Sequence, residues 1–155
     1  MSSKRILIMD DSATSILWAR TILGHARYEV LVARNGREGI EAAIAHRPHL
    51  ILIGTAGADM DGFAVCRALR AHEATQATPI VLVTGRDAKD EASEARRSGA
   101  DDTVTKPIAK DELLAKVRRL LVAQIGRIAP ADRHVLRAVP RPVSGRGPAS
   151  GSSAA

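Results

Sequence analysis

The first 124 residues alternate short apolar runs with longer stretches in which apolar residues recur every three or four positions. The short runs predict strands, and several are apolar at consecutive positions, as in strands buried on both faces of a parallel sheet. The stretches between them have the period of amphipathic helices. The predicted strands are Arg5–Met9, Glu29–Ala33, Leu50–Ile53, Pro79–Thr84 and Thr103–Thr105.

A helix is predicted after each of these strands. Because strand and helix alternate five times, the connections should be right-handed crossovers. The sequence therefore predicts an α/β fold: a five-stranded parallel sheet, doubly wound with five helices. In such a sheet a site forms beyond the carboxyl ends of the strands. The predicted helices are Ala13–His25, Arg37–His46, Gly62–His72, Ala88–Ser98 and Lys110–Gln124.

Composition narrows the class of protein. Hydrophobic residues make up 45% of the chain and aromatic residues only 2%, which suits an aliphatic core of helices on a parallel sheet. The single cysteine, Cys66, is expected in the core; it excludes an internal disulfide and favours a reducing compartment. No apolar run approaches the roughly 20 residues that cross a bilayer. We therefore expect a cytoplasmic protein without membrane insertion.

Charge is distributed unevenly along the chain. The net charge is +6, but residues 125–155 hold five Arg against one Asp, so the remainder is nearly neutral. The same C-terminal segment is rich in Pro, Gly, Ser and Ala and cannot bury enough apolar surface to fold. We predict a single domain over residues 1–124 and a basic, disordered tail over residues 125–155.

Polar residues that could form a site stand where predicted strands end. Asp10 and Asp11 follow the first strand, Thr84 ends the fourth, and Lys106 and Pro107 follow the fifth. A pair of carboxylates suits a hard cation such as Mg²⁺. The Thr84 hydroxyl could donate to a phosphoryl oxygen, and Lys106 could neutralise its charge. The component missing from this set is a nucleophile on the third strand.

Four segments resemble, in order and spacing, the receiver domains of bacterial response regulators, including the chemotaxis regulators. The resemblance covers about 120 residues and implies a flavodoxin-like receiver fold that serves two-component signalling and phosphorelays. It also implies that signalling proteins are the partners. The segments are Ile6–Ser12 (ILIMDDS), Asp59–Phe63 (DMDGF), Pro79–Gly85 (PIVLVTG) and Gly99–Pro107 (GADDTVTKP).

The resemblance also implies roles for individual residues. Asp10 and Asp11 match the metal-binding acid pair of the family, and Thr84 matches its phosphoryl-binding hydroxyl. Lys106 matches the charged lysine, which is usually joined by a cis peptide bond to the proline that Pro107 matches.

Two positions depart from the pattern of the family. Gly54 stands where the family has its phosphorylated aspartate, and glycine cannot accept a phosphoryl group. Thr103 stands where the family usually has a Tyr or Phe that rotates on phosphorylation. Without a third carboxylate, Lys106 can pair with Asp10 and Asp11, so Mg²⁺ is expected to bind weakly or not at all. No other cofactor is expected.

Helical periodicity predicts one exposed apolar residue on the first helix. If Trp18, Ala19, Ile22 and Leu23 form the core face of that helix, Leu17 points to solvent. Leu17 is therefore a candidate interface residue.

The last two helices differ in apolar content. Val122, Ile125 and Ile128 extend the stripe of the last helix beyond what the domain needs, and could contact the tail, a second copy or a partner. Val122 and Ile125 are therefore candidate interface residues. The fourth helix offers only Ala88, Ala92 and Ala95 to the sheet, so it should be held weakly.

Three functional hypotheses follow. The leading one is a non-enzymatic pseudo-receiver that binds signalling proteins as an adaptor or regulator, independently of phosphorylation. The second is an acceptor-null variant of a conventional receiver, although the change at Thr103 argues against it. The third is weak nucleic-acid binding through the basic tail, which is disfavoured because no DNA-reading module follows the domain and the tail lacks aromatic residues.

Overall fold

The computed structural model describes residues 3–55, 60–85 and 91–127. The chain divides into two units, Met1–Leu121 and Val122–Ala155, and the first holds the whole sheet. Of the predicted tail, only residues 125–127 are described, as the end of the last helix, so its disorder stays a prediction. No helix in the described part of the chain is long and apolar enough to span a membrane.

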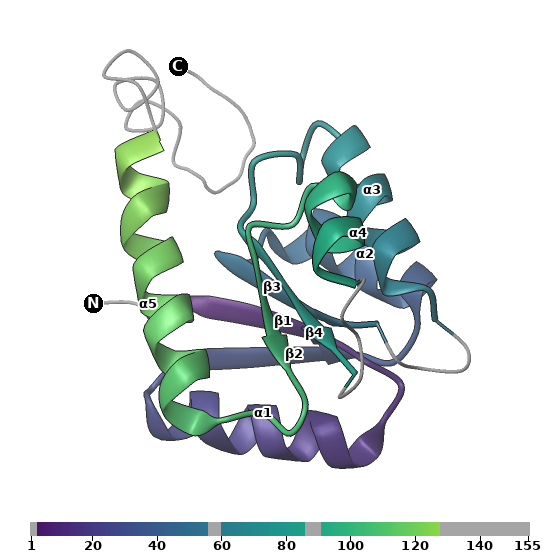
Figure 1. Cartoon of the computed structure of the whole chain (residues 1–155). Helices are drawn as coiled ribbons and strands as arrows, with labels where there is room; N and C mark the ends of the chain where they lie inside the picture. Colours follow the sequence, from purple (N-terminus) through teal and green to yellow (C-terminus); the bar gives the residue numbers. More distant parts are fainter. Residues whose placement is uncertain (1–2, 56–59, 86–90, 128–155) are drawn as a thin grey trace. The chain divides into compact units, whose positions relative to one another are not determined.

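Five parallel strands form one sheet in the order β2-β1-β3-β4-β5 (Figure 1). Each strand is followed by a helix, so the predicted doubly wound parallel fold is confirmed. The register places Met9 beside Ile53, and Gly54 beside Val83, which brings the carboxyl ends of β1, β3 and β4 together. The strands are β1 (Arg5–Met9), β2 (Glu29–Ala33), β3 (Leu50–Gly54), β4 (Ile80–Thr84) and β5 (Asp102–Thr105).

The helices cover both faces of the sheet within the first unit. Side chains alternate along each strand, so Ile6 and Ile8 pack against α1 and α5 while Leu7 and Met9 pack against the other helices. Figure 1 shows α2, α3 and α4 together on that second face. The helices are α1 (Ala13–His25), α2 (Gly36–His46), α3 (Gly62–Ala71), α4 (Glu91–Ser98) and α5 (Lys110–Arg127).

Side-chain caps define where three helices begin. Ser12 accepts a hydrogen bond from the backbone N–H of Ser15 at the start of α1, and Asn35 accepts one from Glu38 at the start of α2. The carboxylate of Asp61 accepts from the two residues that follow Gly62, which fixes the start of α3 beside the end of β3. Asp61 is thus the N-terminal cap of α3.

Two expectations about packing have different outcomes. Cys66 is fully buried, as predicted, and burial raises the pKa of its thiol. The placement of Trp18 in the core was wrong: its side chain is 47% exposed, and Ile16 occupies the core position instead. Trp18 lies at the border of the apolar face, where its indole N–H reaches the carbonyl oxygen of Ile108. Leu17 is exposed, as predicted.

The fourth helix buries little apolar surface, as expected, since Ala95 is its only buried hydrophobic residue. Polar contacts nevertheless hold it to neighbouring elements. Glu91 accepts a hydrogen bond of 3.0 Å from the Thr55 hydroxyl after β3, and Glu94 pairs at 3.0 Å with Arg67 of α3. Because exposed ion pairs contribute little to stability, the weak attachment of this helix stays a prediction. The predicted residue Ala88 lies outside the described residues.

Candidate functional site

The polar residues singled out from the sequence do converge at the carboxyl edge of the sheet. Asp10 directly follows β1, Thr84 ends β4, and Lys106 directly follows β5. The Nζ atom of Lys106 lies 3.8 Å from Oδ2 of Asp10. Asp10 and Thr84 are both buried, at 4% exposure each, so the strand ends hold these groups in place.

The Asp10 carboxylate occupies the space beside Gly54. A Cβ atom added to Gly54 would stand only 2.4 Å from Oδ2 of Asp10. The other carboxylate oxygen, Oδ1, accepts a hydrogen bond of 3.0 Å from the backbone N–H of Ser12. With Asp10 in this conformation, position 54 has no room for a side chain.

The backbone of Gly54 is also approached closely from α3. A Cβ atom on Gly62 would stand 2.5 Å from the Gly54 carbonyl oxygen. Only glycine therefore lets the first turn of α3 approach the end of β3 this closely. Of the intervening loop, residues 56–59 lie outside the described residues.

One cation at this edge was missed by sequence reasoning. Arg34, which directly follows β2, donates from Nη2 to the backbone carbonyl oxygen of Asp11 at 3.4 Å. The rule that directs attention to residues just after parallel strands applies to β2 as well and could have found it. Arg34 and Lys106 thus place two cationic side chains near the Asp10–Asp11 pair.

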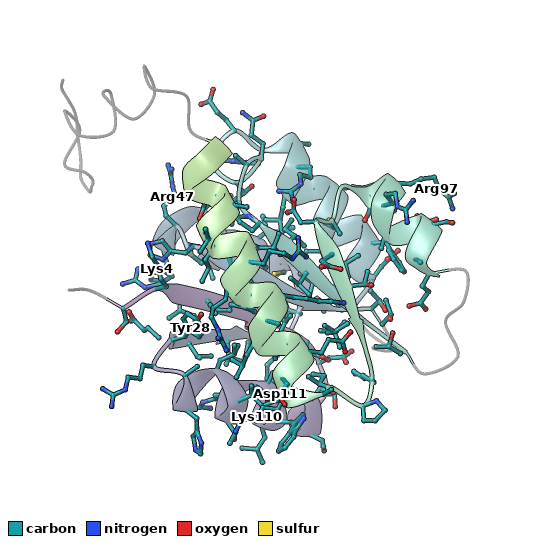
Figure 2. All side chains as sticks on the ribbon, turned by 60° about the vertical axis from the view of Figure 1, so that its left-hand side comes forward. Lys4, Tyr28, Arg47, Arg97, Lys110 and Asp111 are labelled. Carbon is teal, nitrogen blue, oxygen red and sulfur yellow. The ribbon has the colours of Figure 1, made fainter. Side chains whose placement is uncertain are left out.

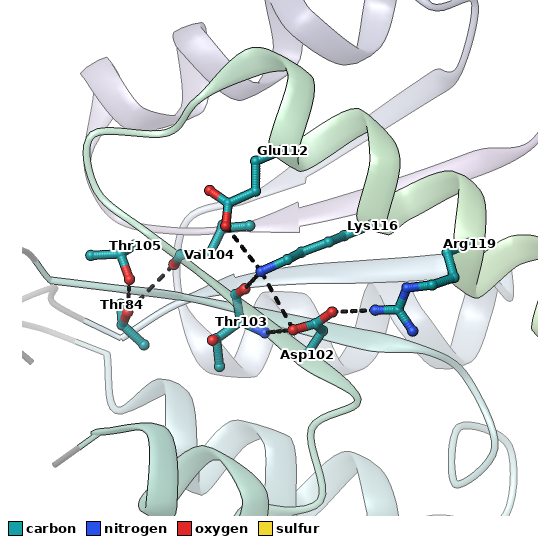
Figure 3. Close-up of polar contacts among 8 residues, drawn as sticks. All are labelled: Thr84, Asp102, Thr103, Val104, Thr105, Glu112, Lys116 and Arg119. Carbon is teal, nitrogen blue, oxygen red and sulfur yellow. Dashed lines mark hydrogen bonds and ion pairs between the residues drawn. The ribbon is translucent and has the colours of Figure 1, made fainter. Parts of the chain in front are cut away.

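Thr84 contacts β5 through its hydroxyl, and Lys106 directly follows β5 in the chain. The Thr84 hydroxyl lies 3.4 Å from the carbonyl oxygen of Val104 and 3.3 Å from the Thr105 hydroxyl (Figure 3). The peptide bond between Lys106 and Pro107 is cis, as the resemblance implied.

Thr103 lies in β5 beside a cluster of charged side chains (Figure 3). Lys116 of α5 donates to the Thr103 carbonyl oxygen and pairs with Glu112 at 3.0 Å and with Asp102 at 3.5 Å. Arg119 also pairs with Asp102. This cluster joins α5 to β5 and could not be read from the sequence, because the three residues on α5 and the one on β5 meet only after folding.

Of the candidate interface residues, Leu17 and Val122 have exposed side chains, at 66% and 69%. The side chain of Ile125 lies outside the described residues, as does all of Ile128. The described residues contain no group of three His, Cys, Asp or Glu side chains arranged to hold a metal ion. The described part of the site can therefore pair charges and form hydrogen bonds, and the last residue of β3, Gly54, carries no side chain.

Comparison with known proteins identifies the family. Residues 6–118 match the model of the response regulator receiver domain. The chain is 36% identical over 118 residues to the response regulator PleD of Caulobacter vibrioides, covering 76% of this chain and 26% of PleD. It is 32% identical over 117 residues to the protein PilH of Pseudomonas aeruginosa, covering 76% of this chain and 97% of PilH. The chain thus spans about a quarter of PleD but nearly all of PilH.

Solved structures agree with the sequence comparison. A CheY-like receiver domain protein from Methanospirillum hungatei has a TM-score of 0.70 at 31% identity, covering 81% of this chain and 98% of that one. The chemotaxis protein CheY4 of Vibrio cholerae has a TM-score of 0.72 at 28% identity, covering 77% and 99% of the two chains. Receiver domains of this kind are generally non-catalytic modules that interact with signalling proteins. The chain belongs to the response regulator receiver family of bacterial signal transduction.

Proposed function

We propose that this chain is a pseudo-receiver, which binds signalling proteins in the cytoplasm as an adaptor or regulator without being phosphorylated. The observation that carries the proposal is the position of Asp10 relative to Gly54, the residue that matches the phosphorylated aspartate of the family. The Asp10 carboxylate lies where the Cβ atom of an acceptor side chain would be, 2.4 Å from that point. The packing around position 54 thus accommodates glycine and no larger residue while Asp10 keeps this conformation.

The charges at the site support the same proposal. Oδ2 of Asp10 faces Lys106 at 3.8 Å, and its Oδ1 accepts the Ser12 N–H. Both carboxylate oxygens of Asp10 therefore already have a partner within the chain. Mg²⁺ takes near-octahedral oxygen ligands and dehydrates reluctantly, so such a site fits the ion poorly. We expect the basic side chains, not a metal ion, to neutralise the acid pair.

The surroundings of Thr84 and Thr103 support a receiver without a phosphate-driven switch. The Thr84 hydroxyl is engaged with β5, through Val104 and Thr105. Thr103 lacks the aromatic ring that the family moves at this position. A ligand shifts a conformational equilibrium only as far as it discriminates between the two states, and neither residue supplies that discrimination.

The test is treatment of the full chain with acetyl phosphate and Mg²⁺, followed by intact-mass measurement, with beryllofluoride as a non-covalent mimic. We expect no mass increase and no change in amide chemical shifts at Asp11, Thr84 or Lys106. An acid-labile gain of one phosphoryl group would overturn the proposal. A matched PilH-like receiver that retains the aspartate would show that the donor is active.

Partner capture provides the positive arm of the test. The chain used as bait should retain the same binding proteins before and after acetyl phosphate treatment. Binding that appears only after this treatment would contradict a phosphorylation-independent role.

A further inference from the structure

A pocket of about 140 Å³ lies between α4 and β5. Its wall is formed largely by small side chains, those of Ala92 and Ala95 on α4, Ala100 after the helix and Thr103 on β5. Arg96, Asp101 and Asp102 also line it. A cavity of about 150 Å³ is large enough to hold a benzene ring. The pocket therefore has the size of one aromatic side chain.

The two acidic residues of the pocket are already paired. Asp101 accepts from Nη2 of Arg70 at 2.8 Å and from the backbone N–H of Ile80 at 2.9 Å. Asp102 pairs with Lys116 at 3.5 Å and with Arg119 (Figure 3). Neither carboxylate is thus left to attract a cationic ligand.

Arg96 differs from these acids and from its neighbour Arg97. Arg97 pairs with Glu94 at 3.1 Å, whereas the guanidinium of Arg96 makes no hydrogen bond or ion pair with any residue that the structure describes. Because Arg96 also lines the pocket, the pocket carries one uncommitted positive charge. A ligand with a carboxylate next to its ring would complement that charge.

Thr103 also brings a polar group to the wall of the pocket. The backbone N–H and carbonyl oxygen of Thr103 are bonded to Asp102 and Lys116, but its hydroxyl has no partner within the described parts of the chain. Figure 3 shows the Thr103 side chain directed away from Lys116. A phenol therefore fits better than a phenyl group, since its hydroxyl can bond Thr103.

We propose that the pocket binds a tyrosine side chain of a partner protein, with an adjacent acidic residue of that partner paired to Arg96. This inference rests on the proposed function, because it names the kind of protein segment through which an adaptor would be recognised. The chain itself supplies no ring, since no aromatic residue is among those that line the pocket.

The first experiment uses p-cresol, the side chain of tyrosine, in an amide NMR titration of the full chain. Saturable shifts should be confined to the amides of Ala92, Ala95, Ala100 and Thr103. The affinity for p-cresol that they report should be at least threefold higher than the affinity for toluene. Ala92→Leu and Thr103→Tyr, which fill the pocket, should each abolish the shifts. Ala68→Leu is the matched control, because Ala68 is an exposed alanine in the groove between α2 and α3. Equal shifts in all variants would overturn the proposal.

The second experiment compares two short peptides, one with tyrosine between aspartates and one with tyrosine between lysines. The acidic peptide should bind at least fivefold more tightly, and Arg96→Gln should remove this preference while Arg97→Gln preserves it. Binding of both peptides with equal affinity would contradict the role of Arg96. Failure of p-cresol and the acidic peptide, in a protein that still resists acetyl phosphate, would exclude the pocket and leave the proposed function standing. Self-association lost in Ala92→Leu would instead identify a second copy as the occupant.

Discussion

Trp18 donates a hydrogen bond of 2.8 Å from its indole Nε1 to the carbonyl oxygen of Ile108. Ile108 directly follows Lys106 and Pro107, so the indole contacts the loop that carries the site lysine. Trp18 is the single tryptophan of the chain. Its fluorescence therefore reports selectively on changes in this loop.

We predict that Mg²⁺ causes no saturable change in Trp18 fluorescence at submillimolar concentration. The reason is that Asp10 is already paired with Lys106 and the backbone of Ser12. Fluorescence titration, checked by amide shifts near Asp11, measures the affinity. A dissociation constant well below 1 mM would contradict this account of the site. Lys106→Met provides the contrast, since removal of the internal cation should strengthen Mg²⁺ binding.

Gly54→Asp should destabilise the protein when Mg²⁺ is absent. Its Cβ atom would overlap the Asp10 carboxylate, which must rotate, and a second negative charge would be added nearby. We expect a loss of about 1–3 kcal/mol in the free energy of unfolding, the usual cost of overpacking. Urea unfolding with and without Mg²⁺ measures the effect, and millimolar Mg²⁺ should restore part of it. Gly54→Ala should lose stability without responding to Mg²⁺.

Gly54→Asp should also regain slow phosphorylation by acetyl phosphate, because Asp10, Asp11, Thr84 and Lys106 occupy the matching positions. It should not regain a switch, since Thr103 is too small to follow a movement of Thr84. Partner affinity measured with and without beryllofluoride should therefore change less than tenfold, or about 1.4 kcal/mol of coupling. A larger change would show that the switch operates without its aromatic residue.

Arg70 should contribute strongly to stability because its guanidinium joins three segments. It donates to the carbonyl oxygens of Gly99 at 2.8 Å and Thr78 at 2.6 Å, and pairs with Asp101 at 2.8 Å. Arg70→Met removes the side-chain donor of the Gly99 and Thr78 carbonyl oxygens and the charge partner of Asp101, and we expect a loss of about 3 kcal/mol on urea unfolding. Arg67→Met is the control. It breaks an exposed pair with Glu94 and should cost less than about 1 kcal/mol. Equal losses would refute the assignment.

His49 should make stability depend on pH. Its Nδ1 accepts the backbone N–H of Arg5 at 2.9 Å, so this nitrogen must be unprotonated. Burial, followed by the charges of Lys4 and Arg5, lowers the pKa of His49 from its ordinary value of 6.5. The folded state thus takes up the proton less readily than the unfolded state. The stabilisation is present above about pH 6.5 and is lost as pH falls toward the lowered pKa.

The measurement is urea unfolding at a series of pH values between about 7.5 and 5. His49→Asn keeps an acceptor in a similar place without titrating, so its stability should fall less as pH decreases. Replacement of His25, which is exposed on α1, is the control and should leave the pH dependence of the parent. An unchanged pH profile in His49→Asn would rule out this histidine as the cause.

Much of the fold followed from the sequence because the sheet is buried on both faces. The strands Arg5–Met9 and Glu29–Ala33 and the helix Ala13–His25 were predicted with their observed bounds. Other boundaries shifted where the cause is local: α2 begins one residue early, after its Asn35 cap, and β3 extends to Gly54. Periodicity placed Trp18 in the core because a residue at the border of an apolar face has the same spacing as one inside it.

The candidate site was predictable only in part. Asp10, Thr84 and Lys106 could be placed together because the ends of parallel strands meet at one edge. The conformation of the Asp10 side chain beside Gly54 could not be predicted, because a rotamer depends on the partners that folding brings near. The roles of Arg70 and Arg96 could not be predicted either, because the sequence does not show whether an arginine side chain is paired in the folded protein.

The outer edge of β5 ends the sheet, and an edge strand with free backbone groups invites another strand to join it. At Thr103 both such groups are already taken, the N–H by the Asp102 carboxylate at 2.8 Å and the carbonyl oxygen by the Lys116 ammonium. Strand addition at this residue would have to break both bonds. The lysine and the aspartate thus oppose fibre-like self-pairing of the domain at Thr103, in the middle of this edge strand.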